Sequence, residues 1–369
     1  MGDVNLLSSA QLREAGPCDR AAAILLSLLA DLLGAVSSLL FSRSVVIKGR
    51  RFVLRSVIAE GGCSIVYLAQ PSDGGRGAQL YAIKQILSDS IEGRDEVQRE
   101  VTSHRAVVHD NCMPIIDVGV DHAPGGRECA SLLFPFLAGG SAQDLINSAS
   151  ASRVRPPFAE AAAAAVGVGV ARGLAALHSS GRAHRDVCPR NVLLRAPPAP
   201  QVAPLASLHV SDVVLADFGS CAPVSVRISS RADALRLQEE AAVRSSQPYR
   251  APELWHVDAP ATVTGEATDV FALGCTVFAC AFGFSPFEST RGDDGQLKLC
   301  EASHTRVLGA APTLPAGHGF SQRFVDTVLA CVEKDPSKRP TIAQVLAALE
   351  PLAGQSSRGQ RTRVAVSVA

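Results

Sequence analysis

Runs of apolar residues along the chain predict both helices and strands. Residues 21–41 hold eight leucines broken by small polar residues three and four positions apart, a spacing that predicts a helix with a narrow polar stripe. The alanine-rich run 159–178, which ends before Gly181, predicts a long buried helix. Residues 80–84 and 213–216 are short apolar runs, typical of strands with little exposure.

Composition limits the classes of function. The chain has 369 residues, 47% of them hydrophobic, which is enough for a large core. Its 35 Lys and Arg balance its 35 Asp and Glu, so no basic stripe points to nucleic acid and no acidic tail points to a basic partner. Ten cysteines are scattered without the spacing of a zinc site, so we expect free thiols.

Two short polar motifs follow the long predicted helix. Residues 184–191 read His-Arg-Asp-Val-Cys-Pro-Arg-Asn, and Asp-Phe-Gly begins at Asp217, directly after the predicted strand 213–216. This combination is typical of phosphoryl transfer, in which one Asp accepts a hydroxyl proton while an Asn and a second Asp hold metal ions. Asp186 is therefore the candidate catalytic base, and Asn191 and Asp217 are the candidate metal ligands.

A lysine and a glutamate upstream complete the candidate phosphate site. Lys84 ends the strand-like run Leu-Tyr-Ala-Ile-Lys, a pattern whose lysine contacts the α- and β-phosphates. Its expected partner is Glu100, on a predicted helix, with Glu96 one turn away as the rival. Downstream, the tripeptide Ala-Pro-Glu ends at Glu253, and it accompanies the His-Arg-Asp and Asp-Phe-Gly motifs in the same set of signatures.

A glycine-rich segment before Lys84 departs from the expected phosphate-binding pattern. Only two of its residues match G-x-G-x-x-G-x-V, because Ala and Ser stand at two glycine positions. Ala and Ser are the smallest replacements, so a stiffer phosphate cradle is expected. The candidate cradle consists of Ala59, Glu60, Gly61, Gly62, Cys63, Ser64 and Val66.

In this order and spacing, the motifs resemble eukaryotic protein kinases over residues 52–352. Within that superfamily the chain is most similar to the Numb-associated kinases, and in particular to a lipid-modified member, through segments such as Glu-Gly-Gly-Cys-Ser at Glu60 and the run 245–254. The resemblance implies an α+β bilobal fold, with a small β-rich N-lobe and a larger, mostly helical C-lobe. It also implies ATP and Mg²⁺ as cofactors and a hydroxyl group of a protein as the acceptor.

The resemblance also implies a binding site for adenine. Phe134 would be the gatekeeper, and residues 135–137, including Phe136 and Leu137, would form the hinge that bonds the base. Three apolar side chains would sandwich the ring, which suits a flat aromatic base. They are Val66, Ala82 and Leu193. Asp269 would brace the catalytic loop, and Arg339 would pair with Glu253.

Cys188 leaves open whether the hydroxyl that accepts the phosphate belongs to serine or threonine or to tyrosine. Serine/threonine kinases usually carry Lys two residues after the catalytic Asp, and here that position is Cys188. We hypothesise that Arg190 supplies the missing charge, as an Arg does in receptor tyrosine kinases. Pro189 and Ser246 match the serine/threonine pattern, so a serine/threonine kinase is the favoured interpretation. The alternatives are a tyrosine or dual-specificity kinase, and a nucleotide-binding scaffold without turnover.

Arg185 raises the question of its counter-charge. In active kinases this Arg often pairs with a phosphorylated residue of the activation segment. The segment after Asp217 contains several serines, and residues 234–243 predict a short helix with Glu239 and Glu240 outward. Its expected inward residues are Leu235, Leu237, Ala241 and Ala242. Either a phosphoserine or these glutamates would serve, and the sequence leaves the choice open.

The ends of the chain lie outside the kinase-like region. Residues 1–51 form an extension whose apolar helix 21–41 would lie on a membrane surface, span a membrane marginally, or dock on the kinase domain. Leu6 breaks the myristoylation pattern after Gly2, while Cys18 is a weak palmitoylation candidate. A secretory signal is disfavoured, so a cytoplasmic or membrane-associated protein is expected. Residues 353–369 predict a disordered tail.

Overall fold

The structure, a computed structural model, describes most of the kinase-like region. It covers residues 44–61, 64–75, 77–88, 90–122, 128–152, 154, 156–197, 204–291 and 297–354. The expectations for the helix 21–41, for Gly2 and Cys18, for Gly62 and Cys63, and for the tail beyond 354 lie outside the described residues.

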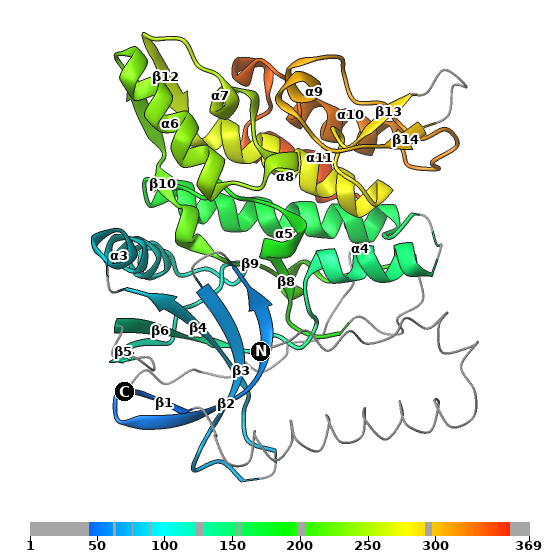
Figure 1. Cartoon of the computed structure of the whole chain (residues 1–369). Helices are drawn as coiled ribbons and strands as arrows, with labels where there is room; N and C mark the ends of the chain where they lie inside the picture. Colours follow the sequence, from blue (N-terminus) through cyan, green and yellow to red (C-terminus); the bar gives the residue numbers. More distant parts are fainter. Residues whose placement is uncertain are drawn as a thin grey trace, which may run out of the picture.

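The N-terminal part of the described chain, residues 44–135, forms an antiparallel sheet with one helix beside it (Figure 1). The strand order is β1-β2-β3-β4-β6-β5. The elements are β1 (Ser44–Ile47), β2 (Arg50–Glu60), β3 (Ser64–Pro71), β4 (Tyr81–Leu87), α3 (Ile91–Arg105), β5 (Asp117–His122) and β6 (Glu128–Pro135). Ser90 caps α3 by accepting a hydrogen bond from the Gly93 N–H, which satisfies a donor that has no partner inside the helix.

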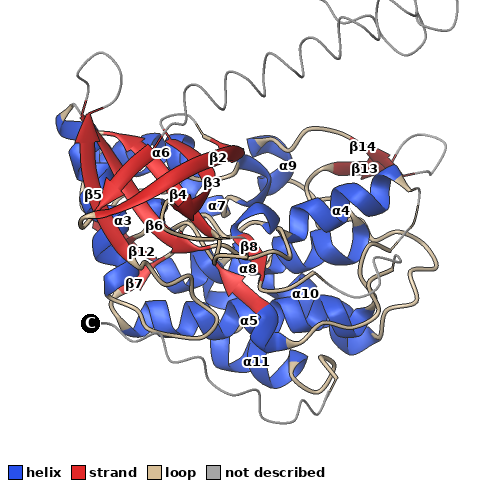
Figure 2. Cartoon of the chain, turned by 90° about the horizontal axis from the view of Figure 1, so that it is seen from below, coloured by secondary structure: helices blue, strands red, loops and turns tan. Residues whose placement is uncertain are grey.

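The remaining part of the described chain, from residue 142 onward, is mainly helical. Its helices are α4 (Ala142–Ala151), α5 (Glu160–Ser179), α6 (Arg231–Arg244), α7 (Pro252–Trp255), α8 (Gly265–Phe282), α9 (His304–Leu308), α10 (Gln322–Cys331) and α11 (Ile342–Leu349). Four short strand pairs accompany them: β7 (Arg182–Ala183) with β10 (Ala222–Pro223), β8 (Val192–Leu194) with β9 (Val213–Leu215), β11 (Ser225–Ile228) with β12 (Ala261–Thr264), and β13 (Ser289–Arg291) with β14 (Leu297–Leu299). Figure 2 shows strands β2 to β6 together at the upper left, while β13 and β14 lie on the other side of the molecule, close to α4.

Helices α5 and α8 form the centre of the helical lobe. Both are long and apolar enough to cross a membrane, but 78% and 89% of their apolar windows are buried inside the protein, so here they are core helices. Alanines and glycines of α5 allow neighbouring elements to approach closely. A Cβ added at Gly169 would lie 2.5 Å from Cβ of Val213. This contact sets β9, and the motif that follows it, directly against α5.

The α+β bilobal fold expected from the sequence is confirmed. The predicted helix 159–178 is α5, and the predicted strand 213–216 is β9. The predicted helix 234–243 is part of the longer α6, but the prediction of which residues face inward was partly wrong. Leu237 is buried while Leu235 is 47% exposed, because the face that packs on Ile228 follows the spacing 234, 237, 241.

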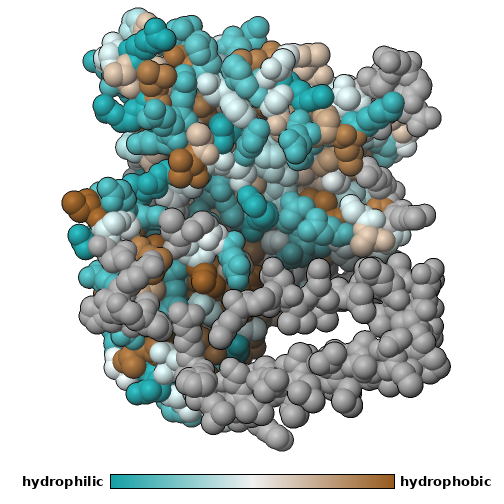
Figure 3. Space-filling view, viewed as in Figure 1, coloured by the Kyte–Doolittle hydropathy of each residue, from teal (hydrophilic) through white to brown (hydrophobic). Residues whose placement is uncertain are grey.

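Large apolar side chains that are exposed on the described part of the surface include Val108 and Val243. Figure 3 shows a mainly hydrophilic face over the helical lobe, with apolar side chains in small separate groups. The eight cysteines in the described ranges are free thiols, and seven of them are buried. This agrees with the free thiols expected from the cysteine spacing.

Candidate active site

A lysine between two carboxylates lies where the sheet meets the helical lobe. Lys84, on β4, holds its Nζ 2.9 Å from both carboxylate oxygens of Glu100 on α3 and 2.8 Å from Oδ1 of Asp217. The side chains of Lys84 and Glu100 are 12% and 1% exposed, whereas Asp217 is 47% exposed and faces solvent. Of the two candidate partners on the helix, Glu100 is therefore the residue that contacts Lys84, and Glu96 does not.

The three charges shift one another's pKa values. Burial would lower the pKa of Lys84, but the carboxylates of Asp217 and Glu100 outweigh it and raise the pKa above its ordinary value. The Lys84 ammonium lowers the pKa of Asp217 to about 2. Burial raises the pKa of Glu100 to about 7, although Lys84 opposes that rise. Lys84 and Asp217 therefore keep their charges at neutral pH.

The loop after β7 is fixed by a buried carboxylate. Asp269, on α8, accepts hydrogen bonds from the backbone N–H of His184 at 2.7 Å and of Arg185 at 2.8 Å. The His184 side chain is fully buried, and its Nε2 lies 3.1 Å from the carbonyl oxygen of Ala216, just before Asp217. The loop and the Asp-Phe-Gly segment are thus held together by direct contacts.

Asp186 projects from this loop with both carboxylate oxygens engaged. Oδ1 accepts from the backbone N–H of Ser246 at 2.7 Å, and Oδ2 accepts from Nδ2 of Asn191 at 3.0 Å. Burial raises the pKa of Asp186, although the Ser246 N–H lowers it. These contacts fix the orientation of a carboxylate that can accept a proton.

Two oxygen atoms beside Asp186 remain available to a metal ion. Asn191 uses its Nδ2 for Asp186, and Asp217 uses its Oδ1 for Lys84 and for the N–H of Gly219. Within the described part of the chain, Oδ1 of Asn191 and Oδ2 of Asp217 have no hydrogen-bond partner. A carboxylate and an amide oxygen are hard ligands that suit Mg²⁺, so the donor set fits the metal that the sequence implies.

The residues expected around adenine lie close together. Ala82, Leu137 and Leu193 pack on one apolar cluster that includes the buried side chain of Phe134. Among the described residues, the backbone N–H of Leu137 has no partner, while that of Phe136 donates to the carbonyl oxygen of Leu80 at 3.4 Å. One free hinge donor beside these apolar side chains can bind the edge of a flat base.

The glycine-rich segment forms the turn between β2 and β3. Ala59 pairs with Val66 and Glu60 with Ile65 across the two strands, and the N–H of Gly61 donates to the carbonyl oxygen of Ser64 at 2.8 Å. Val66 pairs with Lys84 on the next strand. The segment therefore lies next to Lys84, the residue expected to contact the phosphates.

Arg190 and Cys188 both contact Ser246. Arg190 donates from NH2 to Oγ of Ser246 at 3.0 Å, and Ser246 Oγ lies 3.5 Å from Sγ of Cys188. Ser246 is also the residue whose backbone N–H binds Asp186. Arg190 is thus a cation near Asp186, as is Arg250. Cys188 brings no charge to this place, since burial raises the pKa of its thiol to about 11.

Sequence reasoning missed His104 as a site residue. Its buried ring stacks on Phe218 of the Asp-Phe-Gly segment, with centroids 4.3 Å apart and planes inclined by 7°. His104 lies one helical turn after Glu100, on the same face of α3, and this spacing was the available signal. His104 therefore links the helix that carries Glu100 to the segment that carries Asp217.

Comparison with known proteins agrees with this geometry. The protein kinase domain model matches residues 52–349. Serine/threonine-protein kinase 16 of Mus musculus is 30% identical over 84% of this chain and 92% of its own length. Serine/threonine-protein kinase ppk13 of Schizosaccharomyces pombe is 27% identical over 87% and 96%, and serine/threonine-protein kinase ENV7 of Saccharomyces cerevisiae is 26% identical over 84% and 94%.

The family uses ATP as the phosphate donor together with a divalent metal ion. The site above offers the Lys84 ammonium, oxygen atoms that suit a metal ion, and a cluster of apolar side chains beside a free backbone N–H. The chain belongs to the protein kinase family, and it is a serine/threonine protein kinase.

Proposed function

We propose that this chain transfers the γ-phosphate of Mg²⁺-ATP to serine or threonine hydroxyls of proteins through the residues of the site described above. Asp186 orients the hydroxyl and accepts its proton, and Lys84, held by Glu100, positions the α- and β-phosphates. Asn191 and Asp217 are the ligands of Mg²⁺, which when bound neutralises charge on the phosphates.

One observation carries this proposal. The Lys84 ammonium lies within 2.9 Å of Glu100 and 2.8 Å of Asp217, while one oxygen of Asp217 stays free. Lys84 is therefore preorganised for phosphate, and a metal ligand is held beside it. Positioning of this kind supplies most of the catalysis in phosphoryl transfer, because the protein has little covalent chemistry to do.

We propose that Arg190 takes the role of the absent lysine. Its guanidinium already joins Ser246 Oγ at 3.0 Å, and the backbone N–H of Ser246 orients Asp186. From there Arg190 would stabilise the negative charge that passes between ATP and the acceptor hydroxyl. This role accounts for a serine/threonine kinase in which Cys188 replaces the usual cation.

The nucleotide and the limits of the domain complete the proposal. Ala82, Val66 and Leu193 would sandwich adenine, with Phe134 at the back and the hinge residues Phe136 and Leu137 at the edge. The turn from Ala59 to Ser64, which contains Glu60, Gly61, Gly62 and Cys63, would cover the phosphates. Residues 52–352 would be the kinase domain, between an extension of 1–51 and a tail of 353–369. This domain would belong to the Numb-associated family.

We propose that the enzyme acts in the cytoplasm, with membrane-surface contact through residues 21–41.

The test is the dependence of phosphate transfer on Asp186. Purified wild-type chain and Asp186→Asn would be incubated with radiolabelled Mg²⁺-ATP and a generic protein substrate. We expect the variant to lose at least about a hundredfold in rate, because a general base contributes roughly that much or more. Nucleotide binding should be retained, since Asp186 is not assigned to ATP. Equal incorporation by both proteins would overturn the assignment of Asp186.

A further inference from the structure

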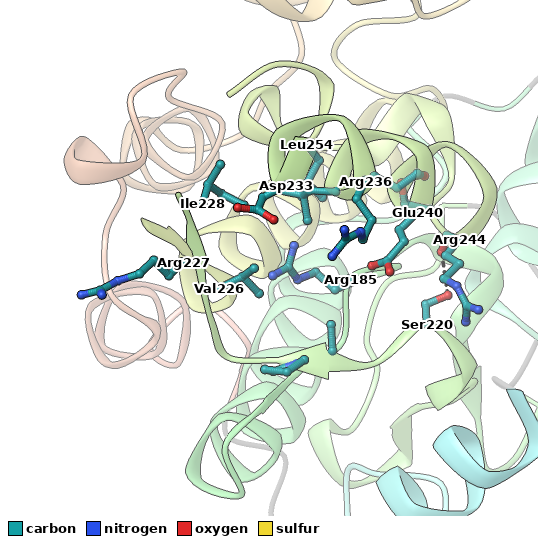
Figure 4. Close-up of a pocket in the computed structure, with 15 residues that line it drawn as sticks. Arg185, Ser220, Val226, Arg227, Ile228, Asp233, Arg236, Glu240, Arg244 and Leu254 are labelled. Atoms are coloured by element: carbon teal, nitrogen blue, oxygen red, sulfur yellow. Dashed lines mark hydrogen bonds between the residues drawn. The ribbon is translucent and has the colours of Figure 1, made fainter. Parts of the chain in front are cut away.

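A cavity separate from the phosphate site lies behind the catalytic loop. It has a volume of about 270 Å³ and lies between Arg185, β11 and helix α6 (Figure 4). Four arginines line it, against two acidic residues, Asp233 and Glu240. Two of them, Arg227 on β11 and Arg236 on α6, are exposed at its rim. None of these residues has a part in the proposed phosphate transfer.

Arg185 is the unusual member of this group. The residue is only 8% exposed, and its Nε and NH2 have no hydrogen-bond partner among the described residues. Figure 4 shows its guanidinium between α6 and β11, toward the centre of the cavity. A buried guanidinium without a partner costs free energy, and an anion that hydrogen-bonds to it would remove that cost.

The nearby carboxylates are engaged elsewhere. Asp269 accepts from two backbone N–H groups and lies 2.8 Å from Nε2 of His178. Glu253 is held by Arg339 through two bonds of 2.7 and 2.8 Å. At the cavity itself, Asp233 accepts from the N-terminal groups of α6. The charges of Asp269, Glu253 and Glu240 all favour the charged form of Arg185, but no hydrogen bond joins Glu240 to Arg185 in the described part of the chain.

The remaining lining is apolar. Val226, Ile228, Leu237, Ala241 and Leu254 line the cavity together with the charged residues. A bare oxyanion would leave these apolar side chains without contacts. Apolar cavities of about 150 Å³ bind benzene, so a cavity of this size has room for an apolar ring or short chain as well as an anionic group.

We propose that this cavity is a binding site for a small amphiphilic anion, an organic phosphate or carboxylate with an apolar body. The anionic group would pair with Arg185 and Arg236, and the apolar body would lie against Leu237 and Ala241. Ser245 lines the same cavity, and the next residue, Ser246, binds Asp186 through its backbone N–H. The site therefore lies directly behind the part of the chain that orients the catalytic carboxylate.

The test uses phenyl phosphate as the probe on the full chain. The protein is first treated with a phosphatase and its intact mass is checked, so that no phosphoserine of the chain itself supplies the anion. A saturating non-hydrolysable ATP analogue with Mg²⁺ blocks the nucleotide site. Dissociation constants are then measured by ligand-observed NMR for phenyl phosphate, inorganic phosphate and phenol.

We expect phenyl phosphate to bind at least about tenfold more tightly than inorganic phosphate or phenol, because only phenyl phosphate offers both an anion to Arg185 and an apolar ring to the apolar lining residues. Ala241→Phe, which fills the cavity, and Arg236→Gln, which removes a cation at its rim, should each weaken phenyl phosphate by about fivefold or more. Val243→Phe is the matched control, since Val243 lies on the same helix and is 86% exposed. It should leave binding unchanged within about twofold.

Any of three results would overturn the proposal. The first is that inorganic phosphate binds as tightly as phenyl phosphate, and the second is that the ATP analogue displaces the probe. The third is that Arg236→Gln binds phenyl phosphate as tightly as wild type does. Thermal unfolding of each variant shows whether it folds, and if Ala241→Phe does not, the surface variant Arg236→Gln decides the outcome alone.

Discussion

At the scale of single residues, the active site depends on a few side chains that each serve two contacts. Ser246 orients Asp186 through its backbone N–H and receives Arg190 through its hydroxyl, at 2.7 and 3.0 Å. Asn191 gives its amide hydrogens to Asp186 and leaves its oxygen free. A change in one residue should therefore be felt as a loss of rate more than as a loss of fold.

Arg190 gives the sharpest prediction at this scale. Arg190→Ala should lower kcat about 10- to 100-fold, which corresponds to the loss of one charge-assisted hydrogen bond. Arg190→Lys should recover part of the rate, because it restores a cation. The measurement is steady-state kinetics with ATP and a protein substrate. An unchanged kcat in Arg190→Ala would show that Arg190 is only a surface charge.

His104 predicts a pH dependence of stability. Burial lowers the pKa of His104 from 6.5 to about 4, and its Nδ1 is bound to the carbonyl oxygen of Met113 at 2.8 Å. Because the folded-state pKa lies below the unfolded value, the stability that neutral His104 contributes is complete above pH 6.5 and is lost as the pH falls toward 4. Between pH 7 and pH 5, the free energy of unfolding should fall by about 2 kcal/mol more in wild type than in His104→Leu.

Urea unfolding at the two pH values measures this difference. His256→Gln is the control, because the His256 side chain is 60% exposed on the surface. It should lose as much stability on acidification as wild type. If His104→Leu does the same, His104 is not the group that titrates.

At the scale of elements, close packing sets the position of the catalytic segments. Strand β9 lies against α5 at Gly169, and Asp217 follows β9 after one residue. Gly169→Ala should destabilise the protein by about 1 to 2 kcal/mol, because the overpacking cost exceeds the gain in helix propensity. Chemical denaturation would measure it, with Gly75→Ala as the control, since nothing lies within 4 Å of a Cβ added there. Equal effects of the two substitutions would argue against the packing account.

The elements also explain what the sequence could predict. The periodicity of α5 and the apolar run of β9 identify those elements, because burial on all sides leaves an apolar composition. The motif spacing likewise indicated Lys84, Asp186, Asn191 and Asp217. The inward face of α6 was missed in part, because Leu235 is apolar yet 47% exposed. The role of His104 was missed since it depends on a contact with Phe218, 114 positions away along the chain.

At the scale of the whole molecule, a buried ion pair joins distant parts of the helical lobe. Arg339 holds Glu253 through two hydrogen bonds and also donates to the carbonyl oxygen of Ala267. Glu253→Gln should lower the free energy of unfolding by about 3 to 5 kcal/mol, because it leaves a buried guanidinium without its counter-charge. Glu350→Gln breaks the exposed pair with Arg172 and should cost about 1 kcal/mol or less. Urea denaturation of both variants compares them, and similar losses would contradict the structural role of Glu253.

The account as a whole requires an enzyme that phosphorylates serine and threonine. The most direct measurement is transfer of radiolabelled phosphate from Mg²⁺-ATP to an array of peptides in matched sets, in which Ser, Thr or Tyr occupies the same position between the same flanking residues. The account predicts incorporation into the Ser and Thr peptides, little into the Tyr peptides, and none with Asp186→Asn. Preferential labelling of the Tyr peptides, or labelling that persists in Asp186→Asn, would contradict it.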